Sequence, residues 1–255
     1  MSRRLIVNGD DFGFTPEVNL GILEAHRAGI LTSTTLMANG DAFDDAARIA
    51  LANPTLDVGC HLVLIGGRSL VPPHMALPRS VPALLRALSA RRLRVYDELA
   101  AQVRKILAAG LHPTHLDTHK HTHLAPPVLD AVARIAEEFE IGWVRRPFDV
   151  PALGWLFRRV LVRHGCRTTD HFTGFRLTGR FLAADVVRMI HGLPEGLTEF
   201  MCHPGYCGEA LRRADTRLKE SRERELAALT ATETRQALLD CGVELTDYRR
   251  AMLYT

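Results

Sequence analysis

Short apolar runs alternate with longer amphipathic segments along this chain. The short runs have the length of β-strands and cover residues 5–8, 33–37, 57–61, 114–117, 143–145 and 198–202. The amphipathic segments predict helices over residues 16–28, 42–52, 97–109, 126–139, 183–191 and 217–239. Because strands that alternate with helices form βα units, the pattern predicts an α/β fold with a mainly parallel sheet.

We expect a single domain over residues 1–255, folded as a (β/α) barrel-like structure that could have fewer than eight strands. In such folds the active site gathers at the C-terminal ends of the strands. An open sheet would bring the same ends together less completely. The proline-rich segment 71–82 predicts a long loop of the kind that covers an active site.

Side chains that can bind a metal or move a proton stand at the ends of these predicted strands. Asp10 and Asp11 follow the first strand. His61 ends the third strand and His203 follows the last. Because the C-terminal ends of parallel strands meet at one edge of a sheet, we expect these four side chains in one site.

The segment 111–124, with the sequence LHPTHLDTHKHTHL, holds five of the twelve histidines. Imidazole is the commonest neutral metal ligand, and packing alone does not require so many together. Alternation along a strand places His115 and Asp117 on one face. The loop that follows contains three more: His119, His121 and His123. We expect at least one histidine of this segment to bind a metal and others to orient the ligands.

The two consecutive aspartates can divide two tasks. One carboxylate can bind a metal, while the other takes a proton from a water molecule whose pKa the metal lowers. A simple turn is the alternative interpretation of the Asp-Asp-Phe-Gly sequence. A glycosidase could also use the pair, but it needs opposed carboxyl groups about 5–10 Å apart and usually no metal.

Two basic segments allow more than one interpretation. Arg145 and Arg146 follow a predicted strand, where an arginine could keep a carboxylate ionised and oriented, or could form part of a surface cation pair. Residues 155–163 mix large apolar side chains with arginines. This segment could contact a membrane or a lipid-tailed substrate, although a helix packed on the core is favoured.

Composition and missing motifs exclude several classes of protein. The net charge of +3 gives no argument for nucleic acid as a partner. The five scattered cysteines contain no C-x-x-C pair, so they exclude a disulfide framework and a thiolate zinc ribbon. No apolar run approaches the roughly 20 residues that span a bilayer, and no signal-type segment opens the chain, so we expect a cytoplasmic protein. Dinucleotide, Walker-type and serine-esterase motifs are absent.

Five segments carry a family resemblance: VNGDDFG at 7–13, GILEAHRAGILTSTT at 21–35, GCHLVL at 59–64, THLDTHKHTH at 114–123 and MCHPG at 201–205. In this order they resemble the YdjC-like carbohydrate deacetylases, a family that includes chitooligosaccharide deacetylases and hopanoid-biosynthesis-associated deacetylases. Gly9 stands where many members have alanine, which fits a subgroup other than the chitooligosaccharide enzymes. The arginine-rich region 155–180 is similar to that subgroup and makes a lipid-linked N-acetylglucosamine a candidate substrate.

The resemblance implies a barrel-like fold and the metal-dependent hydrolysis of an N-acetyl group from an amino sugar. It implies Asp11, His61 and His119 as the metal ligands. Two imidazoles and one carboxylate suit zinc, and nickel, cobalt, iron or manganese would also bind such a set. Magnesium prefers oxygen ligands and is not expected.

The resemblance also implies roles in catalysis. Asp10 would be the base, His203 would be the acid that protonates the departing amine, and Arg145 or Arg146 would support Asp10. The competing functions are a metal-dependent phosphoesterase and a non-catalytic metal-binding or glycan-binding protein on the same barrel. A homodimer is the default expectation for the assembly.

Overall fold

The computed structural model describes residues 2–146 and 151–254. Its eight strands form one sheet in which every pair is parallel. The strands are β1 (Arg3–Phe12), β2 (Ser33–Leu36), β3 (Asp57–Leu62), β4 (His115–Thr118), β5 (Trp143–Val144), β6 (His171–Thr173), β7 (Gly196–Cys202) and β8 (Val243–Thr246). Seven of them follow the order β5-β4-β3-β2-β1-β7-β6, and β8 pairs with β1 beside this path.

The long central strand β1 holds the sheet together. One edge pairs with β7 along its length, from Arg3 opposite Gly196 to Gly9 opposite Cys202. The other edge pairs first with β8 and then, from Asn8 onward, with β2. The resulting sheet is a curled half-barrel. The prediction of a parallel barrel-like α/β fold is therefore confirmed, and the sheet has eight strands.

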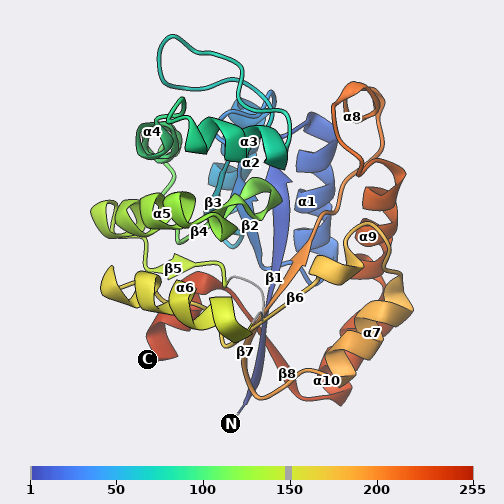
Figure 1. The fold of residues 1–255 in the computed structure, drawn as a ribbon. Coiled ribbons are helices and arrows are strands. Elements are labelled where there is room, and N and C mark those ends of the chain that lie inside the picture. Colours follow the sequence, from blue (N-terminus) through green and yellow to red (C-terminus); the bar gives the residue numbers. More distant parts are fainter. Residues whose placement is uncertain (1, 147–150, 255) are drawn as a thin grey trace.

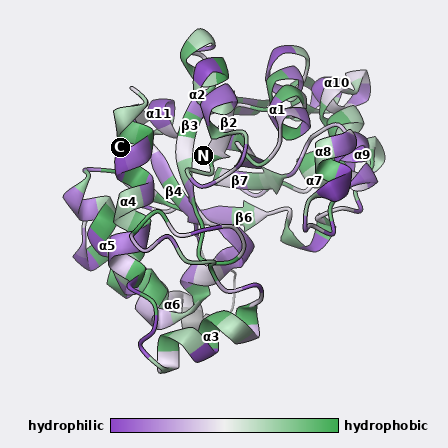
Figure 2. Cartoon of the chain, turned by 90° about the horizontal axis from the view of Figure 1, so that it is seen from above, coloured by the Kyte–Doolittle hydropathy of each residue, from purple (hydrophilic) through white to green (hydrophobic). Residues whose placement is uncertain are grey.

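Helices surround the strands when the molecule is viewed from above (Figure 2). They are α1 (Pro16–Ala28), α2 (Phe43–Ala52), α3 (Val81–Ser89), α4 (Val95–Ala108), α5 (Pro126–Glu138), α6 (Pro151–Arg163), α7 (Ala183–His191), α8 (Glu209–Arg213), α9 (Glu220–Thr230), α10 (Thr232–Asp240) and α11 (Tyr248–Ala251). Three 3-10 segments cover His119–Leu124, Phe175–Leu177 and Met252–Tyr254. None of the described helices combines the length and apolar character needed to span a membrane.

Local chemistry explains where several of these elements begin and end. Thr15 caps α1, because its side chain accepts a hydrogen bond from the Val18 backbone N–H, and Pro16 follows as the first helical residue. The predicted helix over 217–239 is wrong as a single element. Ala231 adopts an extended conformation, with φ −62° and ψ 140°, and separates α9 from α10.

The strand ends that matter for function point to one side of the molecule. In Figure 1 the arrow of β1 points upward, toward α3 and α8, while both chain termini lie at the opposite end. The apolar face of α1, including Val18, Ile22 and Ala25, is buried in the core. Because the C-terminal ends of the parallel strands meet at this upper side, side chains at these ends can form one site.

Candidate metal centre

An irregularity in β1 brings both aspartates into the same site. The pairing with β2 shifts register between Gly9 and Phe12, and Asp11 has a φ of 68°. In a regular strand neighbouring side chains face opposite sides, but a bulge with one left-handed residue breaks this alternation. Asp10 and Asp11 consequently line the same cavity. The predicted end of the strand at residue 8 was too early, because β1 continues through this bulge to Phe12.

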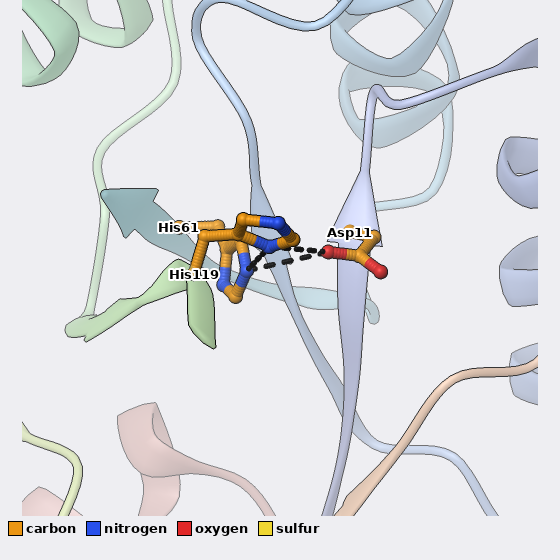
Figure 3. A group of neighbouring side chains, drawn as sticks. All are labelled: Asp11, His61 and His119. Atoms are coloured by element: carbon orange, nitrogen blue, oxygen red, sulfur yellow. Dashed lines mark hydrogen bonds and ion pairs between the residues drawn. The ribbon is translucent and has the colours of Figure 1, made fainter. Parts of the chain in front are cut away.

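Asp11, His61 and His119 come from three distant segments and point their ligand atoms at one another (Figure 3). The Asp11 Oδ1 atom lies 3.3 Å from His61 Nε2 and 3.2 Å from His119 Nδ1. The two imidazole nitrogens are 3.2 Å apart. Within the described part of the chain, Asp11 Oδ1 is buried and has no hydrogen-bond partner of normal geometry.

This triangle fits a divalent metal ion. Ligand atoms about 2.0–2.1 Å from a tetrahedral zinc ion lie about 3.3–3.4 Å from one another. The three separations of 3.2–3.3 Å in the structure match that spacing. Two imidazoles with one carboxylate are also a donor set that suits zinc and its neighbours in the first transition row.

His61 is oriented by a carboxylate behind it. Its Nδ1 lies 2.6 Å from Asp117 Oδ1, which leaves Nε2 to face Asp11. Asp117 is held in turn by a hydrogen bond of 3.0 Å from the Thr35 hydroxyl. Burial by itself lowers the pKa of His61, but Asp117, Asp11 and Asp10 outweigh it and raise this pKa to about 10. The centre therefore favours a positive charge.

Arg222 holds the second oxygen of Asp11. This arginine comes from α9, is 1% exposed and donates a hydrogen bond from Nη2 to Asp11 Oδ2. Burial opposes the ionisation of Asp11, yet Arg222, His119 and His61 keep its pKa well below the usual value. The sequence analysis missed Arg222. An arginine in an amphipathic segment 211 residues from its partner gives no local signal.

Asp10 is held by Arg145. The guanidinium, at the end of β5, donates to both carboxylate oxygens, with Nη2 2.7 Å from Oδ1 and Nη1 2.8 Å from Oδ2. Asn8 donates a third hydrogen bond of 3.1 Å to Oδ1. Burial raises the pKa of Asp10, but the Arg145 charge and hydrogen bonds lower it far below the usual value. Arg145 also contacts the Asp117 and Glu199 carboxylates, at 2.8 Å and 2.7 Å.

Of the two arginines proposed to support Asp10, the structure brings Arg145 to it. Arg146 instead donates a hydrogen bond of 2.6 Å to the Asp170 backbone carbonyl. The difference follows from strand alternation, which turns neighbouring side chains to opposite sides. Pro147 and Phe148, the next two residues of the chain, lie outside the described residues.

His203 lies just beyond the end of β7, as its position in the sequence predicted. Its Nε2 is 3.9 Å from Asp10 Oδ2. Its backbone N–H donates a hydrogen bond of 2.6 Å to Glu225 Oε2, and its Nδ1 is 3.9 Å from the same oxygen. Burial lowers the pKa of His203 to about 4, despite the opposing charges of Asp10 and Asp11. The ring is therefore neutral at neutral pH.

The other histidines of the 115–123 segment have separate environments. His115 Nε2 is 3.0 Å from Asn8 Oδ1, and its ring stacks on Tyr248 with centroids 3.8 Å apart. His123 Nδ1 is 2.6 Å from the Thr118 hydroxyl, and His121 lies edge-on to Phe175. Of these histidines, His119 is the one that joins the triangle with Asp11 and His61.

A cavity of about 690 Å³ lies over the centre, a size that suits a small-molecule ligand. Asp10, Asp11, His61, His119 and His203 all line it. One wall consists of residues 76, 77 and 79 from the proline-rich loop, and residues 214–218 line it as well. The proline-rich loop therefore forms part of the cavity wall.

Comparison with known proteins places the chain in a family. The model for the YdjC-like protein family matches residues 4–240. This chain belongs to the YdjC-like family. The YdjC-like chain is 37% identical to a carbohydrate deacetylase of Brevibacillus brevis over 96% of its own length and 98% of the relative. It is 38% identical to a carbohydrate deacetylase of Geobacillus stearothermophilus, with 98% of each chain covered.

The YdjC-like chain resembles a solved structure from Enterococcus faecalis over its whole length. That structure carries the description of a cellobiose-phosphate cleavage protein. The TM-score is 0.83 at 25% identity, with 98% of this chain and 99% of that chain covered. A lactam utilization protein of Thermus thermophilus has a TM-score of 0.53 at 16% identity and shares the fold.

Proposed function

We propose that this YdjC-like protein is a metal-dependent hydrolase that removes the N-acetyl group from an N-acetylated amino sugar, free or lipid-linked. The observation that carries the proposal is the triangle of Asp11, His61 and His119 beside Asp10, at the floor of a cavity of about 690 Å³. The names of the related carbohydrate deacetylases support the reaction and the substrate class.

Asp11, His61 and His119 would hold the ion. A divalent metal polarises an acetamide carbonyl and lowers the pKa of water, which are the two effects that amide hydrolysis needs. Zinc is our first choice among the ions that suit this donor set. Asp117 and Arg222 would keep the ligand atoms aimed inward, because they bind the outer atoms of His61 and Asp11.

Asp10 would accept the proton of the attacking water. Arg145 keeps its carboxylate ionised over the whole working pH range and fixes its plane through two hydrogen bonds. Such a weakly basic carboxylate can serve only where the pKa of the water is itself lowered. This requirement links the role of Asp10 to the neighbouring metal centre.

His203 would deliver a proton to the departing sugar amine. The neutral ring has no proton to spare at the start, because its pKa is about 4. Its Nε2 lies 3.9 Å from Asp10 Oδ2, so the proton that Asp10 takes from water has a short path to the imidazole. The imidazolium then gives this proton to the amine nitrogen as the C–N bond breaks. One water is consumed, and acetic acid and the free amine are formed, which at neutral pH become acetate and the ammonium form of the amine.

Acetate release from a panel of N-acetylated glycans and glycolipids tests the proposal, with zinc-reconstituted protein and a chelated control. We expect release that chelation abolishes. Asp10→Asn should bind zinc and lose turnover, whereas Asp11→Asn should lose both. If Asp10→Asn retains near wild-type turnover, the assignment of the base is wrong.

The same panel separates the competing functions. Phosphate release from phosphate esters without acetate release would indicate a phosphoesterase. Binding of zinc and glycan without any product would indicate a binding protein. A glycosidase is disfavoured, because it needs one protonated carboxyl group and the pKa values of both Asp10 and Asp11 are lowered.

A further inference from the structure

A long stretch beside the cavity is basic and contains no acid. Residues 58–96 include no aspartate or glutamate. We name residues 66–94 the basic flap; it joins β3 to α4 and includes α3. Its arginines are Arg68, Arg79, Arg86, Arg91, Arg92 and Arg94. Among the described residues, the flap forms one ion pair, between Arg94 and Asp97 at 2.6 Å.

Apolar side chains of the flap are exposed among these arginines. Met75 is 67% exposed, Leu85 is 51% exposed and Val81 is 44% exposed. Leu84 anchors α3, since it is 1% exposed and belongs to the core. The short helix therefore presents its remaining aliphatic and cationic groups around this anchor. It lies at the edge of the molecule when viewed from above (Figure 2).

The flap forms part of the wall of the candidate active site. Gly66, Gly67, Ala76, Leu77 and Arg79 line the cavity. In Figure 1, α3 lies at the end of the sheet toward which β1 points. A surface that bound the flap would consequently lie next to the opening through which a substrate reaches the centre.

We propose that the basic flap docks on an anionic lipid bilayer. Arginines attract the negative surface, and exposed aliphatic side chains gain free energy when they enter the interface between headgroups and acyl chains. Nucleic acid is the less suitable partner. Residues 58–95 contain no phenylalanine, tyrosine or tryptophan on which bases could stack, and exposed aliphatic residues gain nothing from a phosphate backbone.

This inference rests on the proposed function and narrows its substrate to an N-acetylated amino sugar presented at a membrane surface. The flap would hold the cavity mouth against the bilayer, so that a sugar headgroup could enter while its lipid tail stayed in the membrane. Docking itself is a property of the flap and does not depend on turnover.

Co-sedimentation with vesicles tests the docking. We expect binding to vesicles that contain phosphatidylserine, little binding to pure phosphatidylcholine vesicles, and weaker binding as salt is raised. The double variant Leu85→Ser/Arg86→Gln should weaken binding at least fivefold, because it removes one cationic and one aliphatic contact. Neither residue lines the cavity, so acetate release from a short water-soluble substrate should stay unchanged.

The matched control is Leu239→Ser/Arg235→Gln on α10. Leu239 is 75% exposed. Arg235 donates a hydrogen bond to a backbone carbonyl five residues earlier, much as Arg86 does to one four residues earlier. This control should bind vesicles like the wild type. Equal loss in both double variants, binding that ignores lipid charge, or binding of a DNA duplex without vesicle binding would each overturn the proposal. If the wild type binds vesicles but releases no acetate, the proposed function is wrong and the docking proposal stands.

Discussion

Asp117 Oδ1 lies 2.6 Å from His61 Nδ1. This contact fixes which ring nitrogen carries the proton, so that Nε2 stays available to a metal. Asp117→Asn should weaken zinc binding about 10–100-fold, measured by calorimetric titration. Asp41→Asn is the matched control, because Asp41 is exposed and lines the same cavity. An unchanged zinc affinity in Asp117→Asn would remove Asp117 from this role.

Arg222 should determine the stability of the metal-free protein. Arg222→Gln leaves the buried Asp11 carboxylate without its cation, which should lower the free energy of unfolding by about 3–5 kcal/mol. Zinc should restore part of this loss, since the ion supplies positive charge at the same carboxylate. Urea unfolding with and without zinc measures both effects.

Arg224→Gln is the control for this experiment. Arg224 is exposed and lies two residues further along α9, so its loss should change the free energy of unfolding by less than about 0.5 kcal/mol. If the two variants are equally stable without zinc, the buried ion pair between Arg222 and Asp11 does not stabilise the metal-free protein.

Close packing between α1 and the segment that carries His203 should be sensitive to a single methyl group. A Cβ atom at Gly21 would lie 2.3 Å from Gly205 Cα, two residues after His203. Gly21→Ala should cost about 1–3 kcal/mol of stability and should lower turnover more than zinc affinity, because it displaces His203. Gly154→Ala, where a Cβ meets open space, should do neither. Full turnover in Gly21→Ala would show that the segment with His203 and Gly205 can move without loss of activity.

Asp57 should make stability depend on pH. Burial, with the nearby charge of Asp247, raises the pKa of Asp57 from 3.8 to about 6. The folded state therefore holds this proton more tightly than the unfolded state. The associated stability is fully present below about pH 4 and is lost as the pH rises to about 6, a change of about 3 kcal/mol.

Asp57→Asn removes this titration. As the pH rises from 4 to 7, the free energy of unfolding of the variant should increase relative to that of the wild type. The variant keeps an acceptor for the Tyr248 backbone N–H and carries no buried charge. Free energies of unfolding from urea titrations at several pH values measure the difference. A constant difference between the two proteins would mean that Asp57 does not titrate in this window.

The regular elements were predictable because they follow apolar periodicity. The misses have physical causes. β6 and β8 have three and four residues, and polar side chains such as Glu244 interrupt the apolar pattern. The bulge at Asp11 could not be predicted from the sequence. Asp10 and Asp11 are the same residue type, and only the tertiary structure determines which of them adopts a positive φ.

The candidate site shows the same division. The histidine cluster indicated a metal site, but which histidine would face Asp11 depends on a kink. Lys120 and His121 have φ values of 54° and 51°, and this turn separates His119 from the histidines that follow. Arg222 and Glu225 lie on a helix whose sequence suggests only a packed face. Their partners Asp11 and His203 are set by how α9 packs across the strand ends.

Arg145 has a mechanical consequence for the half-barrel. From the end of β5, at one margin of the curled sheet, it binds Asp10 on β1, Asp117 on β4 and Glu199 on β7. Of these three strands, β4 pairs directly with β5, whereas β1 and β7 do not, so the guanidinium links strands across the interior of the half-barrel. Moving β5 away from β1 and β7 would leave the buried carboxylates without their common cation. Access for a bulky molecule must therefore come from movement of the loops above the strands, while the strands themselves stay still.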